Sequence, residues 1–245
     1  MSKKIALVTG GMGGIGTAIC QRLANDGMTV IAGCSAGRNY QEWLDEQKEQ
    51  GFDFHAMPAD VTDFDATQAA IEKVTSEVGV IDVLVNNAGI TRDTTFSRMS
   101  VEQWQDVINT NLNSLFNVTK QVIDQMAETG WGRVVNISSI NGQKGQFGQT
   151  NYSAAKAGMH GFTKALAQEY ARKGVTVNTV SPGYIGTEMV RAVREDVLEK
   201  IVASIPVRRL GEPEEIASIV SWLASNEAGF ATGADFSVNG GLHMY

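Results

Sequence analysis

Short runs of β-branched residues alternate with longer segments of helical apolar spacing, and this alternation constrains the possible folds more than any other feature. In the segment 15–25, for example, Ile15, Ile19 and Leu23 share one helical face. The predicted strands are 5–8, 29–32, 52–57, 81–85, 133–137, 175–180 and 236–238. The predicted helices are 15–25, 40–50, 64–78, 101–127 (with Ser100 as its cap), 152–172, 189–204 and 213–224. Such alternation is typical of a parallel sheet with helices on both faces.

The chain is predicted to form one α/β domain over residues 1–245, a doubly wound (Rossmann-type) domain with about seven parallel strands. Its 245 residues, 43% of them hydrophobic, are enough to bury one substantial core. No internal repeat, linker or low-complexity segment divides the sequence.

Charge and composition argue against several classes of protein. The net charge of −7 and the lack of a long basic run argue against a nucleic-acid partner. Cys20 and Cys34 fit no zinc spacing and are expected to be buried side chains in a reducing compartment, and the scattered His55, His160 and His243 suggest no metal site. Because we find no signal peptide and no apolar run of membrane-spanning length, we expect a cytoplasmic protein with no membrane span.

A glycine-rich segment, Thr9–Gly16, joins the first predicted strand to the first predicted helix. Glycines let a pyrophosphate approach the backbone, and the unpaired N–H groups of a first helical turn favour an anion. Two registers fit the segment: G-x-G-x-x-G on Gly11, Gly13 and Gly16, or T-G-x-x-x-G-x-G on Gly10, Gly14 and Gly16. A merely structural turn is the alternative. The predicted dinucleotide-binding residues are Gly10, Gly11, Gly13, Gly14, Ile15 and Gly16.

The end of the second strand distinguishes NAD from NADP. An acidic residue about 20 positions after the glycines binds the ribose 2′-hydroxyl of NAD, whereas an arginine accommodates a 2′-phosphate. No acidic residue occurs from Gly27 to Gln41, where the chain offers Ser35 and Arg38 instead. The sequence therefore favours NADPH/NADP+, although Arg38 is also compatible with an ordinary solvated charge.

Tyr152 and Lys156 lie four residues apart on one predicted helix, so they share a face. The ordinary pKa of a tyrosine, about 10, is too high for ready proton exchange at neutral pH, and a nearby ammonium is expected to lower it. Ser139 follows the strand 133–137, at the edge where open α/β sheets bind ligands. A Tyr-x-x-x-Lys pair alone is common on helix surfaces. The assignment of this pair to an active site therefore depends on the neighbouring polar residues.

These residues closely resemble the short-chain dehydrogenase/reductase family along the whole chain. The matching elements are the turn Thr9–Gly16, the segment Asn86–Gly89, Asn111, Ser139 with Tyr152 and Lys156, and Pro182-Gly183. The resemblance implies a hydride transfer between a nicotinamide cofactor and a carbonyl compound. Tyr152 would be the general acid, Lys156 would depress its pKa and bind the nicotinamide ribose, Ser139 would bond the carbonyl oxygen, and Asn111 would hold a water on the proton route.

The resemblance also places further cofactor contacts. Asp60 and Val61 would flank the adenine, Asn87, Ala88 and Gly89 would line the cofactor, and Pro182, Gly183 and Ile185 would close over the nicotinamide. No metal is needed, because the protein's donors and the cofactor supply the reaction.

Within the family, the sequence is most similar to the acetoacetyl-CoA reductases of polyhydroxybutyrate synthesis. This resemblance rests on the segments 89–93, 141–149 and 239–244. It implies an acyl-CoA thioester substrate, a lid around 184–205 and contacts from Asp93, Gln146, Phe147, Gln149, Tyr184 and Arg194. CoA is polyanionic, and Arg92, Arg98, Lys144, Arg191 and Arg194 could supply cations, although the last two also fit a solvated helix face.

Three alternatives remain open at this point. A 3-oxoacyl-[acyl-carrier-protein] reductase would share every catalytic residue, a sugar or polyol dehydrogenase is another enzyme of this chemistry, and an inactive dinucleotide sensor is a non-enzymatic reading. The family resemblance further implies a homotetramer built through the long helix 101–127 and the last strand.

Overall fold

The computed structural model describes residues 3–244; residues 1, 2 and 245 of the expected domain lie outside the described residues. The strands are β1 (Ile5–Val8), β2 (Thr29–Cys34), β3 (His55–Pro58), β4 (Val83–Asn86), β5 (Gly132–Ile137), β6 (Val175–Pro182) and β7 (Asp235–Val238). The longer helices are α1 (Gly14–Asn25), α2 (Tyr40–Glu49), α3 (Phe64–Glu77), α4 (Val101–Ile108), α5 (Ser114–Thr129), α7 (Thr150–Tyr170), α9 (Glu195–Ser204) and α10 (Pro213–Leu223). Short helices are η1 (Phe96–Arg98), the π turn η2 (Asn109–Asn113), α6 (Ile140–Lys144), η3 (Ala171–Lys173) and α8 (Glu188–Arg191).

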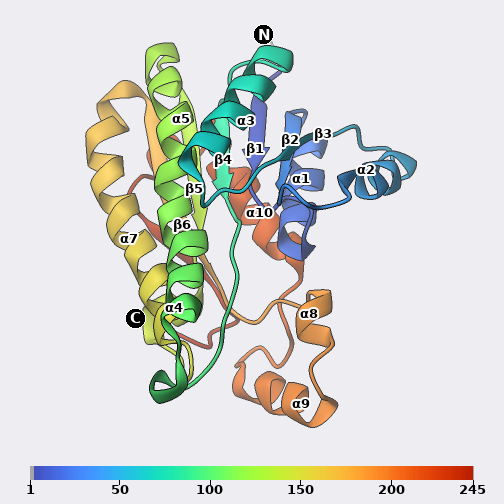
Figure 1. The fold of residues 1–245 in the computed structure, drawn as a ribbon, viewed down its shortest axis with the longest axis vertical. Helices are drawn as coiled ribbons and strands as arrows, with labels where there is room; N and C mark the ends of the chain where they lie inside the picture. Colours follow the sequence, from blue (N-terminus) through green and yellow to red (C-terminus); the bar gives the residue numbers. More distant parts are fainter. Residues whose placement is uncertain (1–2, 245) are drawn as a thin grey trace.

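Within residues 3–244, seven strands form one fully parallel sheet in the order β3-β2-β1-β4-β5-β6-β7. The order reverses at β1, so the chain leaves β1 toward β2 on one side and β4 on the other. Ligands of open α/β sheets bind in the crevice outside the carboxyl ends of the strands at such a reversal. In Figure 1, α8 and α9 lie beyond this edge of the sheet.

Helices cover both faces of the sheet, as Figure 1 shows, with α3 and α5 in front and α1 and α10 behind. On one face, Leu23 of α1 and Ile216 of α10 pack against β1, β2 and β4. On the other, Val118 of α5 and Met126 join Leu84 and Val134 of the sheet. The expected fold class, a single doubly wound domain, is confirmed. None of the helices in the described part of the chain combines the length and hydropathy needed to cross a bilayer.

A buried row of polar side chains ties α7 to the middle of the sheet. The Asn86 amide donates to Asn136 Oδ1 at 2.9 Å and the Asn136 amide donates to Thr163 Oγ1 at 2.8 Å, and Thr163 in turn bonds Thr179 at 2.8 Å. Because these groups are paired, their burial is tolerated and they fix the position of α7 over β4, β5 and β6.

One prediction about the helices is wrong. The segment 101–127 is not a single α-helix, because the π turn Asn109–Asn113 separates α4 from α5. The Asn111 side chain donates to the Val107 carbonyl at 2.9 Å, a position that the widened turn leaves open to a side-chain donor. The expected cap Ser100 is confirmed, since its hydroxyl accepts from Gln103 N in a capping box.

The predicted helix 189–204 is also wrong as one element. It consists of α8 and α9, separated at Arg194, which caps α9 in an extended conformation. The Arg191 side chain at the end of α8 bonds the Gly186 carbonyl at 2.8 Å, which holds α8 against the loop that precedes it. Two short helices, η1 and α6, were not predicted, since three to five residues carry too little periodicity to detect.

The buried amide row makes a stability prediction. Replacing Asn136 with Ala leaves an Asn86 N–H and the Thr163 hydroxyl each short of a partner, which costs about 1–3 kcal/mol. Thermal unfolding should therefore occur roughly 2–12 °C lower. The matched control is Gln41→Ala, which removes an exposed amide bonded to Asp45 and should change stability by less than about 0.5 kcal/mol. Equal Tm values for Asn136→Ala and the control would contradict the role of the row.

Candidate active site

The segment between β1 and α1 turns so sharply that two of its glycines cannot be replaced without strain. Gly10 has a φ of +61°, and a Cβ on Gly16 would lie 2.1 Å from the Gly10 carbonyl oxygen. By contrast, a Cβ on Gly13 would meet nothing closer than 3.8 Å, so the outer side of the turn is open. The inner side of the turn is therefore tightly packed. Its outer side leaves the backbone accessible at the carboxyl edge of the sheet.

The turn is held in place by the end of β4. Asn87 Nδ2 donates to the carbonyls of Thr9 and Gly10 at 3.1 and 3.0 Å. Thr9 Oγ1 in turn accepts the backbone N–H groups of Asn87 and Ala88 at 3.0 and 3.1 Å. The structure thus brings the two sequence-predicted segments, 10–16 and 87–89, together at the reversal point of the sheet.

The first turn of α1 offers donors for an anion. Its cap residue is Gly13, and no side chain of the described residues accepts from the helix start. A Cβ on Gly14 would lie 2.8 Å from Thr187 Cγ2, so the beginning of the 184–205 segment lies directly against the turn. Open backbone donors under a covering segment fit the pyrophosphate of a dinucleotide.

The end of β2 places Ser35 and Arg38 together on an exposed loop. Arg38 N donates to the Ser35 carbonyl at 3.1 Å, and the Arg38 charge acts to lower the pKa of Cys34, although burial raises it overall. Asp60 follows β3, where its carboxylate accepts from Thr62, and Val61 accepts from Asn117 at 2.9 Å. The structure therefore places these four predicted contacts on the loops that follow the carboxyl ends of β2 and β3.

Ser139, Tyr152 and Lys156 form one group where β5 meets α6 and α7. Lys156 is buried and its Nζ donates to the Ile137 carbonyl at 2.8 Å. The same Nζ lies 5.5 Å from the centre of the Tyr152 ring, and the Ser139 side chain is near enough to Tyr152 to act on the pKa of its phenol. The geometry puts a hydroxyl, a phenol and an amine at the carboxyl edge of the sheet.

Burial, rather than the neighbouring Lys156, dominates the pKa of Tyr152 in this structure. Burial raises the pKa of Tyr152, and although the bond to Ser139 lowers it, the Asp93 charge raises it further. The same burial lowers the pKa of Lys156 to about 7, so the ammonium that should stabilise a phenolate is itself partly neutral at pH 7. Tyr152 therefore stays protonated at neutral pH, as a proton donor must.

Asn111 lies in the π turn and faces this group. Its amide donates to the carbonyls of Ile90 and Val107, both at 2.9 Å, while its Oδ1 is buried without a protein partner among the described residues. A Cβ on Gly89 would lie 2.6 Å from that Oδ1 and 3.5 Å from Lys156 Nζ, so Gly89 keeps the space between them open. An unpaired acceptor near an amine is suited to a bridging water.

A chain of hydrogen-bonded side chains leads from Ser139 to Asp93. Gln149 donates to Asp93 at 2.7 Å and accepts from Asn141 at 2.9 Å, while Asn141 N donates to Ser139 Oγ at 3.1 Å. Phe147 is 87% exposed next to them. Gln146 accepts from Lys144 at 2.9 Å, so its amide oxygen is already engaged.

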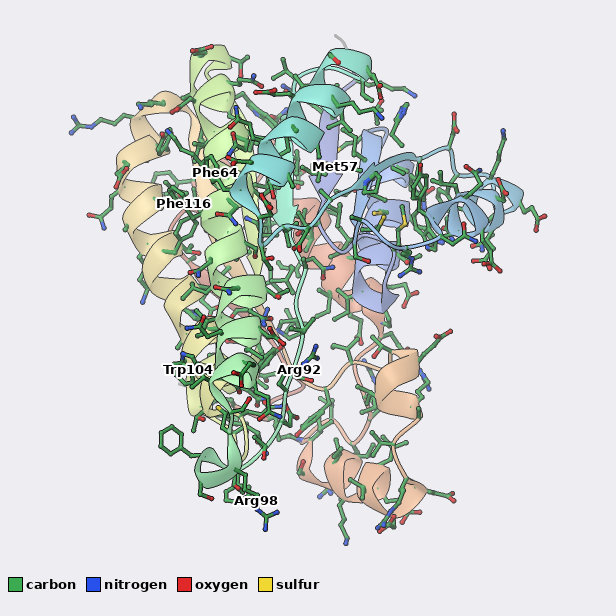
Figure 2. All side chains as sticks on the ribbon, viewed as in Figure 1. Met57, Phe64, Arg92, Arg98, Trp104 and Phe116 are labelled. Atoms are coloured by element: carbon green, nitrogen blue, oxygen red, sulfur yellow. The ribbon has the colours of Figure 1, made fainter. Side chains whose placement is uncertain are left out.

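Other predicted substrate contacts lie on the 184–205 segment. Tyr184 lines a cavity of about 180 Å³ with Ile205, Val207 and Gly240. Arg194 is exposed and paired with Asp196 at 2.7 Å, and Arg191 is paired with Glu212 at 3.0 Å, so both charges are partly compensated. Figure 2 shows Arg92 and Arg98 at the same end of the molecule, beside α4.

Three residues at the site were not given their present role from the sequence. Thr187 lies against the glycine turn, and its position in P-G-Y-I-G-T, at the start of a helix, was an available signal. Thr9 anchors the turn by its hydroxyl, and Asn141 connects Ser139 with Gln149. The sequence pattern of Asn141 offers no comparable signal, because its role depends on the short helix α6.

This geometry agrees with a family match. The family model described as short chain dehydrogenase matches residues 4–198, and the chain belongs to this family. Its members' chemistry requires a nicotinamide dinucleotide, for which the open turn at Gly13 and the crevice beside β4 are suited.

Known relatives are similar over their whole length. An acetoacetyl-CoA reductase of Cupriavidus necator is 70% identical over 245 residues, which cover 100% of both chains. An acetoacetyl-CoA reductase of Allochromatium vinosum is 57% identical over 99% of each chain. A 3-oxoacyl-[acyl-carrier-protein] reductase of Vibrio cholerae is 45% identical over 98% of each chain.

The buried amine makes a pH-dependent prediction. Burial lowers the pKa of Lys156 from 10.5 to about 7, so the unfolded chain binds more protons between these values and folding stability rises with pH there. The free energy of unfolding of the wild type minus that of Lys156→Met should rise by roughly 1.4 kcal/mol per pH unit above pH 7 and be flat below it. Urea unfolding at several pH values measures the difference.

The control for this measurement is Lys164→Met, which removes an exposed lysine from the same helix. Its stability difference from the wild type should not acquire this slope. A flat difference for Lys156→Met between pH 7 and 9 would show that the amine remains charged in spite of its burial.

Proposed function

We propose that this protein reduces acetoacetyl-CoA to (R)-3-hydroxybutyryl-CoA with NADPH, as a step of polyhydroxybutyrate biosynthesis. The observation that carries the proposal is the 70% identity to an acetoacetyl-CoA reductase along the entire chain. The site supports it, because a phenol, a hydroxyl and a buried amine meet at the edge of the sheet where a dinucleotide binds.

The proposed roles follow from the geometry of that group. NADPH supplies the hydride, and Tyr152 gives its proton to the substrate oxygen. Ser139, which lies beside the Tyr152 phenol, stabilises the negative charge that develops on that oxygen. Lys156 and the unpaired Asn111 Oδ1 hold the route by which Tyr152 is reprotonated.

We assign cofactor binding to the turn and to the loops that follow the neighbouring strands. Ser35 and Arg38 would hold the 2′-phosphate, since the described loop after β2 carries no acidic side chain before Glu42. The remaining proposed contacts are Gly10, Gly11, Gly13, Gly14, Ile15, Gly16, Asp60, Val61, Asn87, Ala88, Gly89, Tyr152, Lys156, Pro182, Gly183 and Ile185.

The acyl group would lie between the Gln149 chain and the 184–205 segment. The connection of Asp93, Gln149 and Asn141 supports this placement, because it orients one amide toward Ser139. The proposed contacts are Asp93, Ser139, Gln146, Phe147, Gln149, Tyr152, Tyr184 and Arg194. The 184–205 segment would act as a lid, and its contact with Gly14 couples it to the cofactor turn.

A homotetramer is proposed on the outer face of α3, α4 and α5. Phe116, 55% exposed, stacks on Phe64 with ring centres 6.0 Å apart, and Trp104 lies along the same side (Figure 2). Exposed aromatic pairs of this kind mark interaction surfaces. Light scattering measures the mass, and a monomer would contradict the proposal. The two free, buried cysteines fit a reducing compartment such as the cytoplasm.

Removing the Tyr152 hydroxyl tests the proton donor. Tyr152→Phe should lower kcat by about 10²–10⁴-fold, since general acid catalysis is lost, while NADPH affinity stays nearly unchanged. Tyr170→Phe is the control on the same helix, where the phenol bonds only the exposed Asp124. Turnover retained in Tyr152→Phe would refute the assignment of the proton donor.

Steady-state kinetics with two acyl carriers test the substrate. We expect kcat/KM to be higher for acetoacetyl-CoA than for the acetoacetyl thioester of acyl-carrier protein. A strong preference for the carrier protein would instead support the alternative function, that of a 3-oxoacyl-[acyl-carrier-protein] reductase. The 45% identical relative carries this name.

The cofactor preference is tested at Arg38. The wild type should have a lower KM for NADPH than for NADH, and Arg38→Ala should raise the KM for NADPH about tenfold, because a charged hydrogen bond to the phosphate is lost. The KM for NADH should not change. A wild type that prefers NADH would overturn the choice of NADPH.

A further inference from the structure

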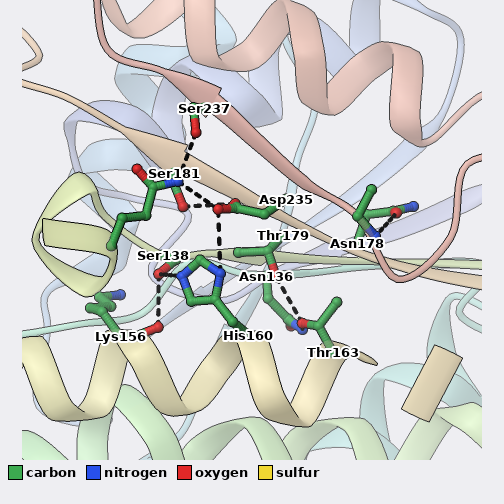
Figure 3. Close-up of polar contacts among 12 residues, drawn as sticks. Asn136, Ser138, Lys156, His160, Thr163, Asn178, Thr179, Ser181, Asp235 and Ser237 are labelled. Atoms are coloured by element: carbon green, nitrogen blue, oxygen red, sulfur yellow. Dashed lines mark hydrogen bonds and ion pairs between the residues drawn. The ribbon is translucent and has the colours of Figure 1, made fainter. Parts of the chain in front are cut away.

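One carboxylate outside the reacting group is bonded from three elements. Asp235, the first residue of β7, accepts Ser181 Oγ of β6 at 2.7 Å and Gln143 Nε2 of α6 at 2.6 Å. The oxygen that accepts from Gln143, Oδ2, also lies 3.3 Å from His160 Nδ1 of α7, and this contact is an ion pair when the imidazole is protonated (Figure 3). Its side chain is only 15% exposed, so these bonds form where water competes little.

On one side, the carboxylate holds the helix that Ser139 begins. Gln143 Nε2 also donates to Ser237 Oγ at 2.7 Å, which ties α6 twice to β7. Ser139 is the cap residue of α6, and its Oγ accepts from Asn141 N. With only five residues, α6 has little stability of its own, so its position depends on such bonds.

On the other side, the carboxylate reaches the backbone of Lys156. His160 Nε2 lies 3.1 Å from Ser138 Oγ, and that hydroxyl donates to the Lys156 carbonyl at 2.9 Å. Figure 3 shows this chain running from Asp235 through His160 and Ser138 to Lys156. The Lys156 turn of α7 is therefore connected to β7 through two side chains.

Helices α6 and α7 are tightly packed where these two sides of the chain of contacts meet. A Cβ on Gly142 of α6 would lie 2.8 Å from the Lys156 carbonyl carbon and 2.9 Å from its Cβ. A shift of α6 relative to α7 would therefore move Ser139 and Lys156 relative to each other.

We propose that Asp235 is a positioning residue for the reduction, which fixes Ser139 relative to Lys156 through Gln143 on one side and through His160 and Ser138 on the other. This inference rests on the proposed roles of Ser139 and Lys156. Misplacement of reacting groups by about 1 Å can cost 10²-fold in rate without loss of binding. Most of the proposed NADPH contacts lie on the glycine turn and on the loops after β2, β3 and β4, which this chain of contacts does not touch, so the carboxylate is expected to act mainly on turnover.

The test compares Asp235→Asn with Asp82→Asn. Asp82 is a matched control, since its side chain is 17% exposed and accepts from Lys4 Nζ at 2.7 Å and Ile5 N at 2.9 Å, at the opposite edge of the sheet. The number of sites is counted by NADPH fluorescence titration, and kcat is expressed per site. We expect kcat of Asp235→Asn to fall about 10- to 100-fold, while both KM values and the NADPH Kd change by less than about twofold. Asp82→Asn should lose stability but keep its kcat per site.

His160→Gln provides the second variant, should Asp235→Asn fold poorly. This variant keeps an amide in place of the ring, and its kcat per site should also fall. The double variant should be no slower than the slower single variant, because both substitutions act on one chain of contacts. Unchanged kcat per site in either folded single variant would overturn the positioning role.

These outcomes are separable from failure of the proposed function. A wild type inactive on acetoacetyl-CoA would refute the proposed substrate, and the variants are then compared with the carrier-protein thioester. An active wild type with an equally active Asp235→Asn would refute only the positioning role.

Discussion

The burial of the Lys156 ammonium group is the constraint on which the site depends. An amine enclosed by protein loses hydration, so its pKa falls and it needs every acceptor that the fold can supply. The Ile137 carbonyl provides one, and the space between Gly89 and Asn111 leaves room for solvent to provide another. The absence of side chains at Gly89 and Gly142 follows from the same crowding.

The parallel sheet makes this arrangement possible. All described strands end at one edge, so residues from distant parts of the chain, Thr9, Asn87 and Ser139 among them, meet there. Buried amide and hydroxyl pairs at Asn136 and Thr163 then seat α7, which carries Tyr152. The helices that cover the two faces contribute stability, whereas the polar groups at the edge determine what can bind and react.

Much of this organisation was predictable from the sequence. Strand–helix alternation predicted the sheet, and the glycine spacing predicted the turn at Thr9–Gly16, because both depend on local patterns. The break in the helix at Asn111 and the short helix α6 were not predictable, since they depend on side-chain bonds across the fold. The raised pKa of Tyr152 was missed for a similar reason, because spacing along a helix shows that Lys156 is near but not how deeply either group is buried.

The π turn has a consequence for how this chain tolerates change in length. One residue more than a regular helix requires is accommodated at Asn109–Asn113. Deleting a residue there would restore regular pitch, but it would also close the widened turn in which the Asn111 side chain donates to the Val107 carbonyl. The Asn111 Oδ1 would then leave the space beside Gly89, so this segment has a fixed length even though it lies in the middle of a helix.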